Sequence, residues 1–211
     1  MVKAIPNLSE EYTLRDAGHV YIAGLDEAGR GAWAGPVCAA AVVLPLGQPD
    51  LPALLADVRD SKLLTPGERE RLLPVILNAA LGVGGGWAAP AEVDEIGILP
   101  ATRRAMLRAV TQLDGRVDAL LIDHVRLPEI SLHQRAFPKA DLRCLSVAAA
   151  SIVAKVRRDQ MMVQLELDFP GYGFAQHKGY GTRQHREALG RLGPSPLHRL
   201  SWRPLQQWQR G

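Results

Sequence analysis

The sequence contains few cysteines and few aromatic side chains. Only two of its 211 residues are cysteine, Cys38 and Cys144, and aromatic residues make up 5%. The cysteines form no CxxC pair and stand at no metal-type spacing from a histidine, which argues against a thiolate zinc site. Both have apolar or mixed neighbours, so we expect small buried side chains in a reducing compartment. Because aromatics are scarce, Leu, Val, Ile and Ala must build the core.

Long apolar runs are absent as well. No stretch approaches the roughly 20 apolar residues that a membrane-spanning helix needs, and the first 18 residues lack the apolar centre of a signal peptide. We expect a cytoplasmic, monomeric protein without a membrane partner. The length and the content of 47% apolar and 22% charged residues predict one globular domain, 1–211, with 1–19 as an N-terminal extension.

Positive charge collects in the C-terminal segment, about 176–211. This segment holds seven Lys and Arg residues and one acid, Glu187, for a net charge of +6, whereas the rest of the chain carries −3. Such a division suits an enzyme that holds cations in one place and phosphates in another. An ordinary solvated helical face explains the same pattern, so charge alone leaves nucleic-acid binding open.

The apolar periodicity predicts an α/β layered domain with a mixed sheet. Two strands, 20–25 and 37–44, flank a glycine-rich turn and are expected to pair antiparallel. Further strands are predicted at 81–88 and 119–122. Helices are predicted after the capping pair Thr65–Pro66, at 99–113, at about 143–167 and at 183–192.

Four acids stand at the ends of these elements. Asp26 and Glu27 follow the first strand, Asp123 closes the strand at 119–122, and Asp141 precedes the long helix. Each also has a structural explanation, since Asp141 is a suitable helix cap and the others suit turns. Adjacent strand residues point to opposite faces, so Asp26 and Glu27 share a site only if the strand ends there or the longer Glu reaches round. Sequence spacing does not show whether the four acids meet.

If the acids meet, they suit hard divalent cations. Mg²⁺ prefers carboxylate oxygens, and a pair of such ions promotes hydrolysis of a phosphodiester. The turn Gly24–Gly31 lacks the lysine of a P-loop and the spacing of a dinucleotide-binding fold. Gly29 and Gly31 instead suit close backbone approach to a ligand or a positive φ. Arg30 between them is either a phosphate contact or an exposed turn residue.

Two further groups are candidates for binding nucleic acid. Ser151 and Lys155 form a polar stripe on the long helix, which suits a phosphate or a solvent-facing surface equally. Tyr180 stands between glycines and bases in the segment 177–183, where an exposed ring can stack on a sugar or a base.

Taken together, these segments resemble the ribonuclease HII family. The resemblance covers about residues 20 to 205 and rests on six motifs in order, followed by His198-Arg199, which fits the family's usual end. The motifs are Gly24-Leu-Asp-Glu-Ala-Gly-Arg-Gly31 with Ala34-Gly-Pro-Val37, Asp60-Ser-Lys62 with Leu64-Thr65, Ile122-Asp123, Lys139-Ala-Asp141, Ala149-Ala-Ser-Ile-Val-Ala-Lys155 with Arg158-Asp159, and His177-Lys-Gly-Tyr-Gly-Thr182.

The resemblance implies a ribonuclease H-like fold, with a mixed five-stranded central sheet flanked by helices and a helical C-terminal extension. It implies an endonuclease that cuts RNA–DNA hybrids, and DNA duplexes containing ribonucleotides, 5′ of the ribonucleotide, leaving 3′-hydroxyl and 5′-phosphate ends. The implied catalytic acids, which bind Mg²⁺ or Mn²⁺, are Asp26, Glu27, Asp123 and Asp141.

Substrate contacts are implied in the same way. The ribonucleotide and its 2′-hydroxyl are contacted by Gly29, Arg30 and Gly31, and Tyr180 stacks at the next deoxyribose. The implied phosphate-binding residues are Lys62, Ser151, Lys155 and Lys178.

Two positions depart from the family pattern. His124 stands where glycine commonly follows the third acid, as a proton carrier or a variable neighbour, and Ala140 replaces a usual glycine before the fourth acid. Neither change removes a ligand. One alternative is a ribonuclease HIII-like enzyme, but that family carries a long N-terminal substrate-binding domain and only about 20 residues precede the first strand here. The other is a nucleic-acid-binding protein without catalysis, against which the intact acidic set argues.

Overall fold

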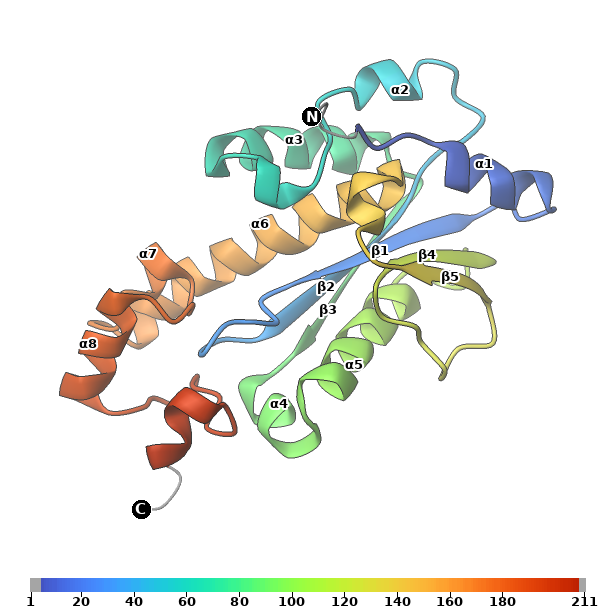
Figure 1. Cartoon of the computed structure of the whole chain (residues 1–211). Coiled ribbons are helices and arrows are strands. Elements are labelled where there is room, and N and C mark those ends of the chain that lie inside the picture. The colour runs from blue at the N-terminus through green and yellow to red at the C-terminus, as the bar shows by residue number, and fades with distance from the viewer. Residues whose placement is uncertain (1–4, 209–211) are drawn as a thin grey trace.

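The computed structural model describes residues 5–208 and contains a five-stranded mixed sheet (Figure 1). The strand order is β3-β2-β1-β4-β5, with the bounds β1 Ile22–Ala28, β2 Val37–Val43, β3 Gly82–Ala88, β4 Ala119–Asp123 and β5 His133–Phe137. β1 and β2 pair antiparallel, as do β2 and β3, whereas β4 lies parallel to β1 and to β5. Residues 1–4 of the expected N-terminal extension and 209–211 of the basic segment, including Arg210, lie outside the described residues.

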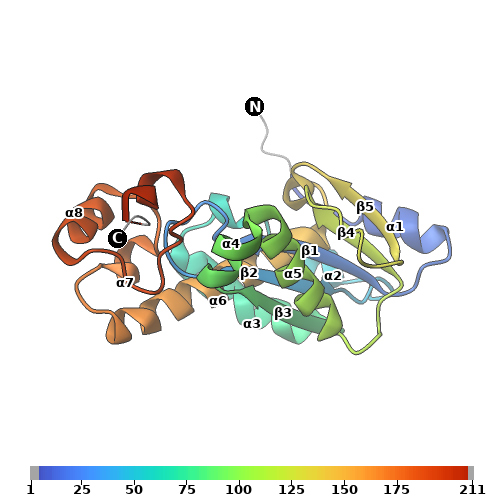
Figure 2. The same cartoon turned by 90° about the horizontal axis from the view of Figure 1, so that it is seen from below.

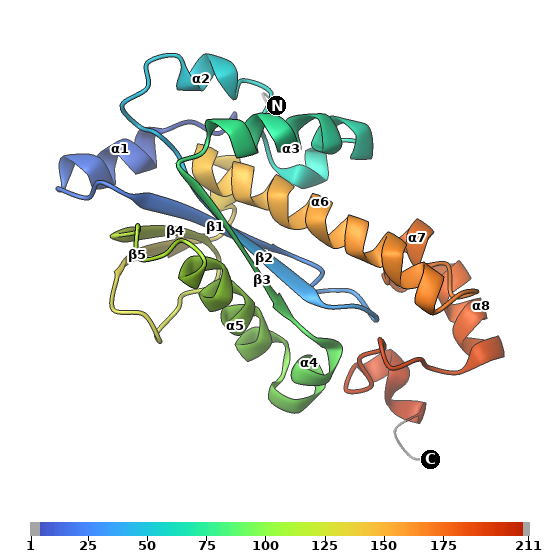
Figure 3. The ribbon, with the colours of Figure 1, turned by 180° about the vertical axis from the view of Figure 1, so that it is seen from behind.

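Helices cover both faces of the sheet (Figures 1 and 3). α6, Leu145–Asp168, packs on one face with α3, Pro66–Ala79, beside it, and α5, Ile98–Thr111, packs on the other face. Buried aliphatic side chains fill both interfaces, as the scarcity of aromatics predicted. The predicted α/β class and the implied five-stranded sheet are therefore confirmed. The shorter helices are α1 Ser9–Asp16, α2 Leu51–Leu54, α4 Pro90–Ile96, α7 Phe174–His177 and α8 Arg183–Leu192, with 3-10 turns η1 Ser61–Leu63, η2 Ala140–Leu142 and η3 Arg203–Trp208.

Glycines allow both long helices to approach the sheet closely. A Cβ on Gly24 of β1 would stand 2.2 Å from the carbonyl carbon of Ser146 at the start of α6. On the other face, a Cβ on Gly84 of β3 would stand 1.9 Å from the carbonyl oxygen of Ala109 in α5. The glycines that interrupt the apolar pattern of the third strand thus serve helix packing, and the first glycine of the Gly24–Gly31 motif does the same.

Most predicted elements occur where the sequence placed them. Thr65 caps α3 as expected, since its hydroxyl accepts the N–H of Glu68 at 3.3 Å while the Glu68 carboxylate accepts the N–H of Thr65 at 2.7 Å. The helix predicted at 183–192 is α8, with the same bounds. Val163 of α6 is 41% exposed, so the buried face of this helix does not include it. Both cysteines are free and buried, as expected.

The sequence signals missed the edge strand β5. Its residues His133–Phe137 carry three polar side chains, and none of the five is fully buried. An edge strand that buries neither face has no apolar alternation to reveal it. Its pairing with β4 completes the sheet beside the acids described below.

The C-terminal segment forms a separate cluster beyond one end of the sheet (Figure 2). α7, α8 and the segment that leads into η3 pack around Phe174, Leu189 and Leu205, the last of which lies in η3, and this confirms the implied helical extension. His185 stacks on His177 within this cluster, with ring centroids 4.4 Å apart. Within residues 5–208, no helix has the length and apolar character needed to cross a lipid bilayer.

Candidate active site

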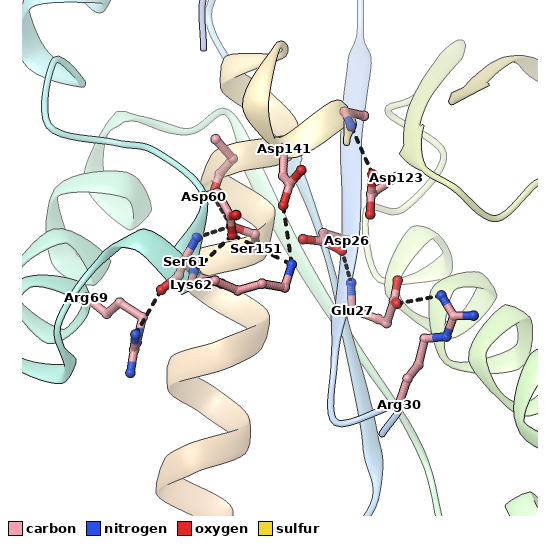
Figure 4. A network of polar contacts seen from close by, with 12 residues as sticks. Asp26, Glu27, Arg30, Asp60, Ser61, Lys62, Arg69, Asp123, Asp141 and Ser151 are labelled. Carbon is pink, nitrogen blue, oxygen red and sulfur yellow. Dashed lines mark hydrogen bonds and ion pairs between the residues drawn. The ribbon is translucent and has the colours of Figure 1, made fainter. Parts of the chain in front are cut away.

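Asp26 and Asp123 lie side by side on two neighbouring parallel strands (Figure 4). β1 and β4 pair with Leu25 opposite Ile122, so the next residue of each strand is one of these acids. Because side chains alternate between faces, both carboxylates lie on the face that α6 covers. Asp26 is buried, with 2% of its surface exposed, and Asp123 is half-buried. The sheet thus brings together two acids that are far apart in the sequence.

Glu27 belongs to the opposite face of β1. The strand continues through both acids to Ala28, so they lie within it rather than after it, contrary to expectation. The Glu27 N–H donates to Asp26 Oδ1 at 2.7 Å, and Arg30 Nη1 donates to Glu27 Oε1 at 3.1 Å. Glu27 Oε2 is buried and has no hydrogen-bond partner. A buried carboxylate oxygen without a donor is costly, so this oxygen is suited to a cation.

Asp141 comes from the connection between β5 and α6. It lies in η2, and α6 begins only after Cys144, so Asp141 does not cap that helix. The Ala140 N–H donates to Asp123 Oδ1 at 2.9 Å, which fixes this turn over the end of β4. Figure 4 shows the Asp141 carboxylate directed toward Lys62, whose Nζ lies 3.4 Å from Asp141 Oδ2. The cap explanation therefore fails, and Asp141 faces the other acids.

Sequence reasoning missed a fifth acid, Asp60. It caps η1 by accepting the N–H of Lys62 at 2.9 Å, and its Oδ1 lies 3.6 Å from Lys62 Nζ. The Lys62 ammonium thus stands between the carboxylates of Asp60 and Asp141 (Figure 4). The sequence motif Asp60–Lys62 indicates only Lys62 as a candidate site residue. An acid in a loop is ordinarily exposed to solvent and needs no partner, so Asp60 gives no sign of a role in the sequence.

Burial and mutual repulsion disfavour the charged form of these carboxyls. Burial, followed by the neighbouring Glu27 and Asp123 carboxylates, raises the pKa of Asp26 well above its ordinary value. Burial also raises the pKa of Glu27 despite the opposing effect of Arg30. Burial raises the pKa of Asp141 as well. A negative charge that burial disfavours can be offset by a bound proton or by a bound metal ion. The raised pKa values of these carboxyls are therefore consistent with a metal site.

The donor set fits a hard divalent cation. Acidic side chains outnumber the bases that contact them: the acids are Asp26, Glu27, Asp60, Asp123 and Asp141, and the bases are Arg30 and Lys62. Carboxylate oxygens without thiolates or imidazoles favour Mg²⁺ or Mn²⁺ over zinc. In the part of the chain that the structure describes, no three or more His, Cys, Asp or Glu side chains form a closed metal-binding group. The acids are neighbours with the Lys62 ammonium among them, not an assembled ligand cage.

The glycine-rich turn, residues 29–36, follows β1 directly. Gly29 has φ +92°, and a Cβ there would stand 1.9 Å from Nε of Arg158, so both the backbone conformation and the space require glycine. Gly31 has neither constraint, because a Cβ there would meet nothing within 4 Å. The side chain of Arg30 turns back to Glu27. Gly31 therefore leaves the turn open on its exposed side, beside Arg30.

Tyr180 lies against two bases of α6. Its ring centroid is 5.6 Å from Lys155 Nζ and 5.4 Å from Arg158 Cζ. Tyr180, Lys155 and Lys178 line one groove of about 510 Å³ between α3, α6 and α7. Lys155 pairs with Asp159 at 2.7 Å, and Lys178 Nζ donates to the carbonyl oxygen of Ala175.

Ser151 is not exposed toward this groove. Its side chain is buried, its hydroxyl donates to the Ala148 carbonyl at 2.8 Å, and its Oγ accepts the N–H of Ser61 at 3.1 Å. The contact holds the Asp60–Lys62 loop onto α6. Ser151 therefore does not face the groove itself; it supports the loop that carries Lys62.

Two arginines have a different position from the one their charge indicated. Arg158 lies on α6 close to Lys155 in the sequence, and Arg199 belongs to the basic segment, yet both are 0% exposed. Arg199 therefore adds nothing to a basic surface. The sequence carried no signal of this burial, because arginine normally marks an exposed helical face.

Comparison with known proteins gives a consistent result. The ribonuclease HII family model matches residues 23–204. A ribonuclease HII of Chloroflexus aurantiacus is 55% identical over 201 residues, which cover 95% of each chain. One from Thermus thermophilus is 51% identical over 186 residues, 88% of each chain. A solved ribonuclease HII of Archaeoglobus fulgidus, in complex with PCNA, aligns with a TM-score of 0.74 at 28% identity and covers 87% of this chain and 95% of that one.

Proposed function

Because the chain belongs to the ribonuclease HII family, we propose that it cuts the RNA strand of RNA–DNA hybrids and of DNA duplexes with single embedded ribonucleotides. Family membership makes it a metal-dependent ribonuclease H-type endonuclease. The exact bond, the number of metal ions and the residue roles are the proposal. The observation that carries the proposal is the placement of Asp26, which is buried, beside Asp123, which is half-buried, on parallel strands. Glu27 Oε2 next to them has no hydrogen-bond donor.

The acids hold two Mg²⁺ or Mn²⁺ ions in this proposal, and the ligands are Asp26, Glu27, Asp123 and Asp141. When bound, such ions supply an activated water and stabilise the departing oxygen. The sheet and η2 hold the carboxylates in place, and burial of Asp26 reduces competition from bulk water. Attack of a water oxygen on phosphorus forms one P–O bond and breaks the bond to the 3′ oxygen, which takes up a proton, so the products are a 3′-hydroxyl and a 5′-phosphate.

The glycine-rich turn supplies recognition of ribose. Gly31 is open to approach and Arg30 stands beside the acids, which supports contact of Gly29, Arg30 and Gly31 with the ribonucleotide and its 2′-hydroxyl. Tyr180 is proposed to stack on the deoxyribose that follows. With the tyrosine on the 3′ side, the cut falls 5′ of the ribonucleotide.

Phosphates of the duplex are proposed to meet the lysines around this site. The Lys62 side chain is 72% exposed, and Lys155 and Lys178 line the groove beside Tyr180. Ser151 acts through the loop that carries Lys62. The proposed biological role is removal of ribonucleotides from DNA and of RNA primers, in the cytoplasm.

Three duplexes test this function: one with a single ribonucleotide, one with a tract of four, and one of DNA alone. Each duplex is incubated with the protein in separate reactions that contain Mg²⁺, Mn²⁺ or EDTA. We expect metal-dependent cutting 5′ of the single ribonucleotide and none of DNA alone. Cutting of the tract alone would favour a ribonuclease HIII-like enzyme, and binding without cutting would favour a catalytically inactive binder. Asp26→Asn protein is the control for a contaminating nuclease.

A further inference from the structure

Arg158 and Arg199 are buried cations that bind neutral oxygens. Both are 0% exposed, and their guanidinium groups donate to backbone carbonyl oxygens rather than to carboxylates. Burial lowers the pKa of each guanidinium, which reflects the free-energy cost of holding the charge there. A buried arginine that forms no ion pair needs several well-directed acceptors. The identity of those acceptors shows what each arginine holds.

Arg158 joins two segments. Its Nε donates to the Pro36 carbonyl at 2.9 Å and its Nη2 to the Ala34 carbonyl at 3.2 Å, both in the glycine-rich turn. Its Nη1 donates to the Lys178 carbonyl at 2.9 Å, in the Tyr180 segment, residues 178–180. The same guanidinium lies 5.4 Å from the Tyr180 ring centroid. Arg158 thus contacts the turn proposed to read ribose and the segment that carries the stacking tyrosine.

Arg199 holds only the first of these segments. Its Nη1 donates to the Arg30 carbonyl at 2.9 Å, and its Nε and Nη2 donate to the Gly35 carbonyl at 3.1 and 2.7 Å. None of these bonds reaches the Tyr180 segment. The two arginines therefore form an internal comparison, because both fix the turn but only Arg158 links it to Tyr180.

The two segments have no room to slide. The Trp33 N–H donates to the Gly179 carbonyl at 2.8 Å. A Cβ on Gly179 would stand 2.2 Å from the Ala34 carbonyl oxygen, and one on Gly29 would overlap the Arg158 side chain. The glycine-rich turn and the Tyr180 segment therefore contact the Arg158 guanidinium from two sides. Because the guanidinium is planar and rigid, it fixes the distance between the two segments.

We propose that Arg158 is a positioning residue that sets the distance between the glycine-rich turn and Tyr180, and thereby the preference for a lone ribonucleotide followed by DNA. The proposal rests on the function proposed above. A substrate with one ribonucleotide must present its ribose to the turn and its next deoxyribose to Tyr180 at once. Within a longer RNA tract, every ribonucleotide except the last is followed by ribose, so cleavage at those internal positions depends less on that distance.

Arg158→Lys tests the proposal, because lysine keeps the charge but loses the fork. The measured quantity is the ratio of kcat/KM for the single-ribonucleotide duplex to that for cleavage at the first three positions of the four-ribonucleotide tract, each of which is followed by ribose. We expect this ratio to fall by about tenfold or more, since a displacement of about 1 Å costs up to 100-fold. Arg157→Lys, the same substitution at the neighbouring residue of α6, is the matched control and leaves the ratio unchanged. Arg199→Lys lowers both rates and keeps the ratio within about twofold.

A second variant covers the case in which Arg158→Lys does not fold. Gly179→Ala keeps the guanidinium but forces the segments apart at Ala34, so it lowers the same ratio. Arg158→Lys combined with Tyr180→Ala tests the route of the effect. If Arg158 acts through Tyr180, the double variant has the ratio of Tyr180→Ala alone.

An unchanged ratio in Arg158→Lys and Gly179→Ala, or a fully additive loss in the double variant, overturns the inference. Failure of the wild-type protein to cut the single-ribonucleotide duplex overturns the proposed function instead. Thermal melting of each variant separates a loss of fold from a loss of preference.

Discussion

The acid cluster and the arginine pair both bury charge of one sign, yet their surroundings differ. Asp26 faces other carboxylates, and Glu27 Oε2 has no donor. Arg158 and Arg199 are surrounded by carbonyl oxygens that satisfy their N–H groups. The first arrangement leaves a free-energy deficit that an added cation can relieve. The second is complete by itself and stiffens the backbone. In this protein, a buried charged group is therefore suited to bind a ligand where it lacks hydrogen-bond or ionic partners, and it has a structural role where those partners are present.

One helix connects the two regions. α6 starts beside the acid cluster, and its second half carries Arg158 and reaches the C-terminal cluster (Figure 3). The region proposed to cut and the region proposed to position the substrate therefore share one helix. Substitutions in the two regions are expected to have opposite signatures, and four measurements, from the largest expected effect to the smallest, examine that contrast.

Asp26→Asn is expected to abolish cleavage while the fold becomes more stable. If Asp26 is the metal ligand proposed above, its loss removes several kcal/mol of transition-state stabilisation, so activity falls on the order of 10³-fold or more. The neutral amide also removes the burial cost and the repulsion that together raise the pKa of Asp26, so the free energy of unfolding rises. Cleavage assays and urea denaturation measure the two effects. A destabilised variant that still cuts contradicts the contrast.

Arg158→Ala is expected to show the reverse signature, dominated by lost stability. The carbonyl oxygens of Ala34, Pro36 and Lys178 lose their donor, which costs roughly 3 kcal/mol or more in the free energy of unfolding. Arg157→Ala, at the next position on α6, changes it by no more than about 0.5 kcal/mol. Urea denaturation of both variants decides the point, and equal losses would show that Arg158 has no special structural role.

A divalent cation is expected to stabilise the folded protein by binding at the acids and not at the arginine pair. At a Mn²⁺ concentration 100-fold above its Kd, the folded protein gains about 2.7 kcal/mol, and EDTA removes the gain. The gain shrinks in Asp26→Asn and persists in Arg158→Lys, because Arg158 donates to backbone carbonyl oxygens and has no acidic partner to offer a cation. Thermal melting with and without Mn²⁺ measures it. An equal shift in Asp26→Asn would place the metal elsewhere.

The smallest expected effect concerns pH and the C-terminal cluster. Burial lowers the pKa of His185 and of His198 to about 4, against an ordinary value of 6.5. Between these values the unfolded chain binds more protons than the folded one, so stability is full above pH 6.5 and is lost as pH falls toward 4. By pH 6 the loss from the two histidines together is on the order of 2 kcal/mol. Urea denaturation at several pH values measures it, and His185→Asn should flatten the slope.

Sequence reasoning reached the acids because burial leaves a pattern. Asp123 follows four apolar residues, and such a carboxylate needs an explanation in any fold. That Asp26 and Asp123 meet depends on the parallel pairing of β1 and β4, which no local pattern specifies. The resemblance to a family supplied that step. It also supplied the fifth strand, since β5 has no apolar alternation of its own.

The arginine pair was beyond prediction from the sequence. An arginine on a helix or in a basic tail ordinarily lies at the surface, and nothing in the motif around Arg158 distinguishes it from an exposed base. Its acceptors are backbone carbonyls, which every residue has. Only the packing of the glycine-rich turn against α6 shows why Gly29 and Gly35 are glycine: a Cβ at either position would overlap Arg158 or Met162.

The bonds from Arg199 to Gly35 have a consequence for how the protein is made. These residues are 164 positions apart, so the turn that follows the first strand is fastened by a residue synthesised long after it. A nascent chain that already contains every acid still lacks this fastening, and contacts of such long range form slowly. During synthesis, the acids proposed to bind metal are therefore all present before the turn proposed to read ribose is fastened by Arg199.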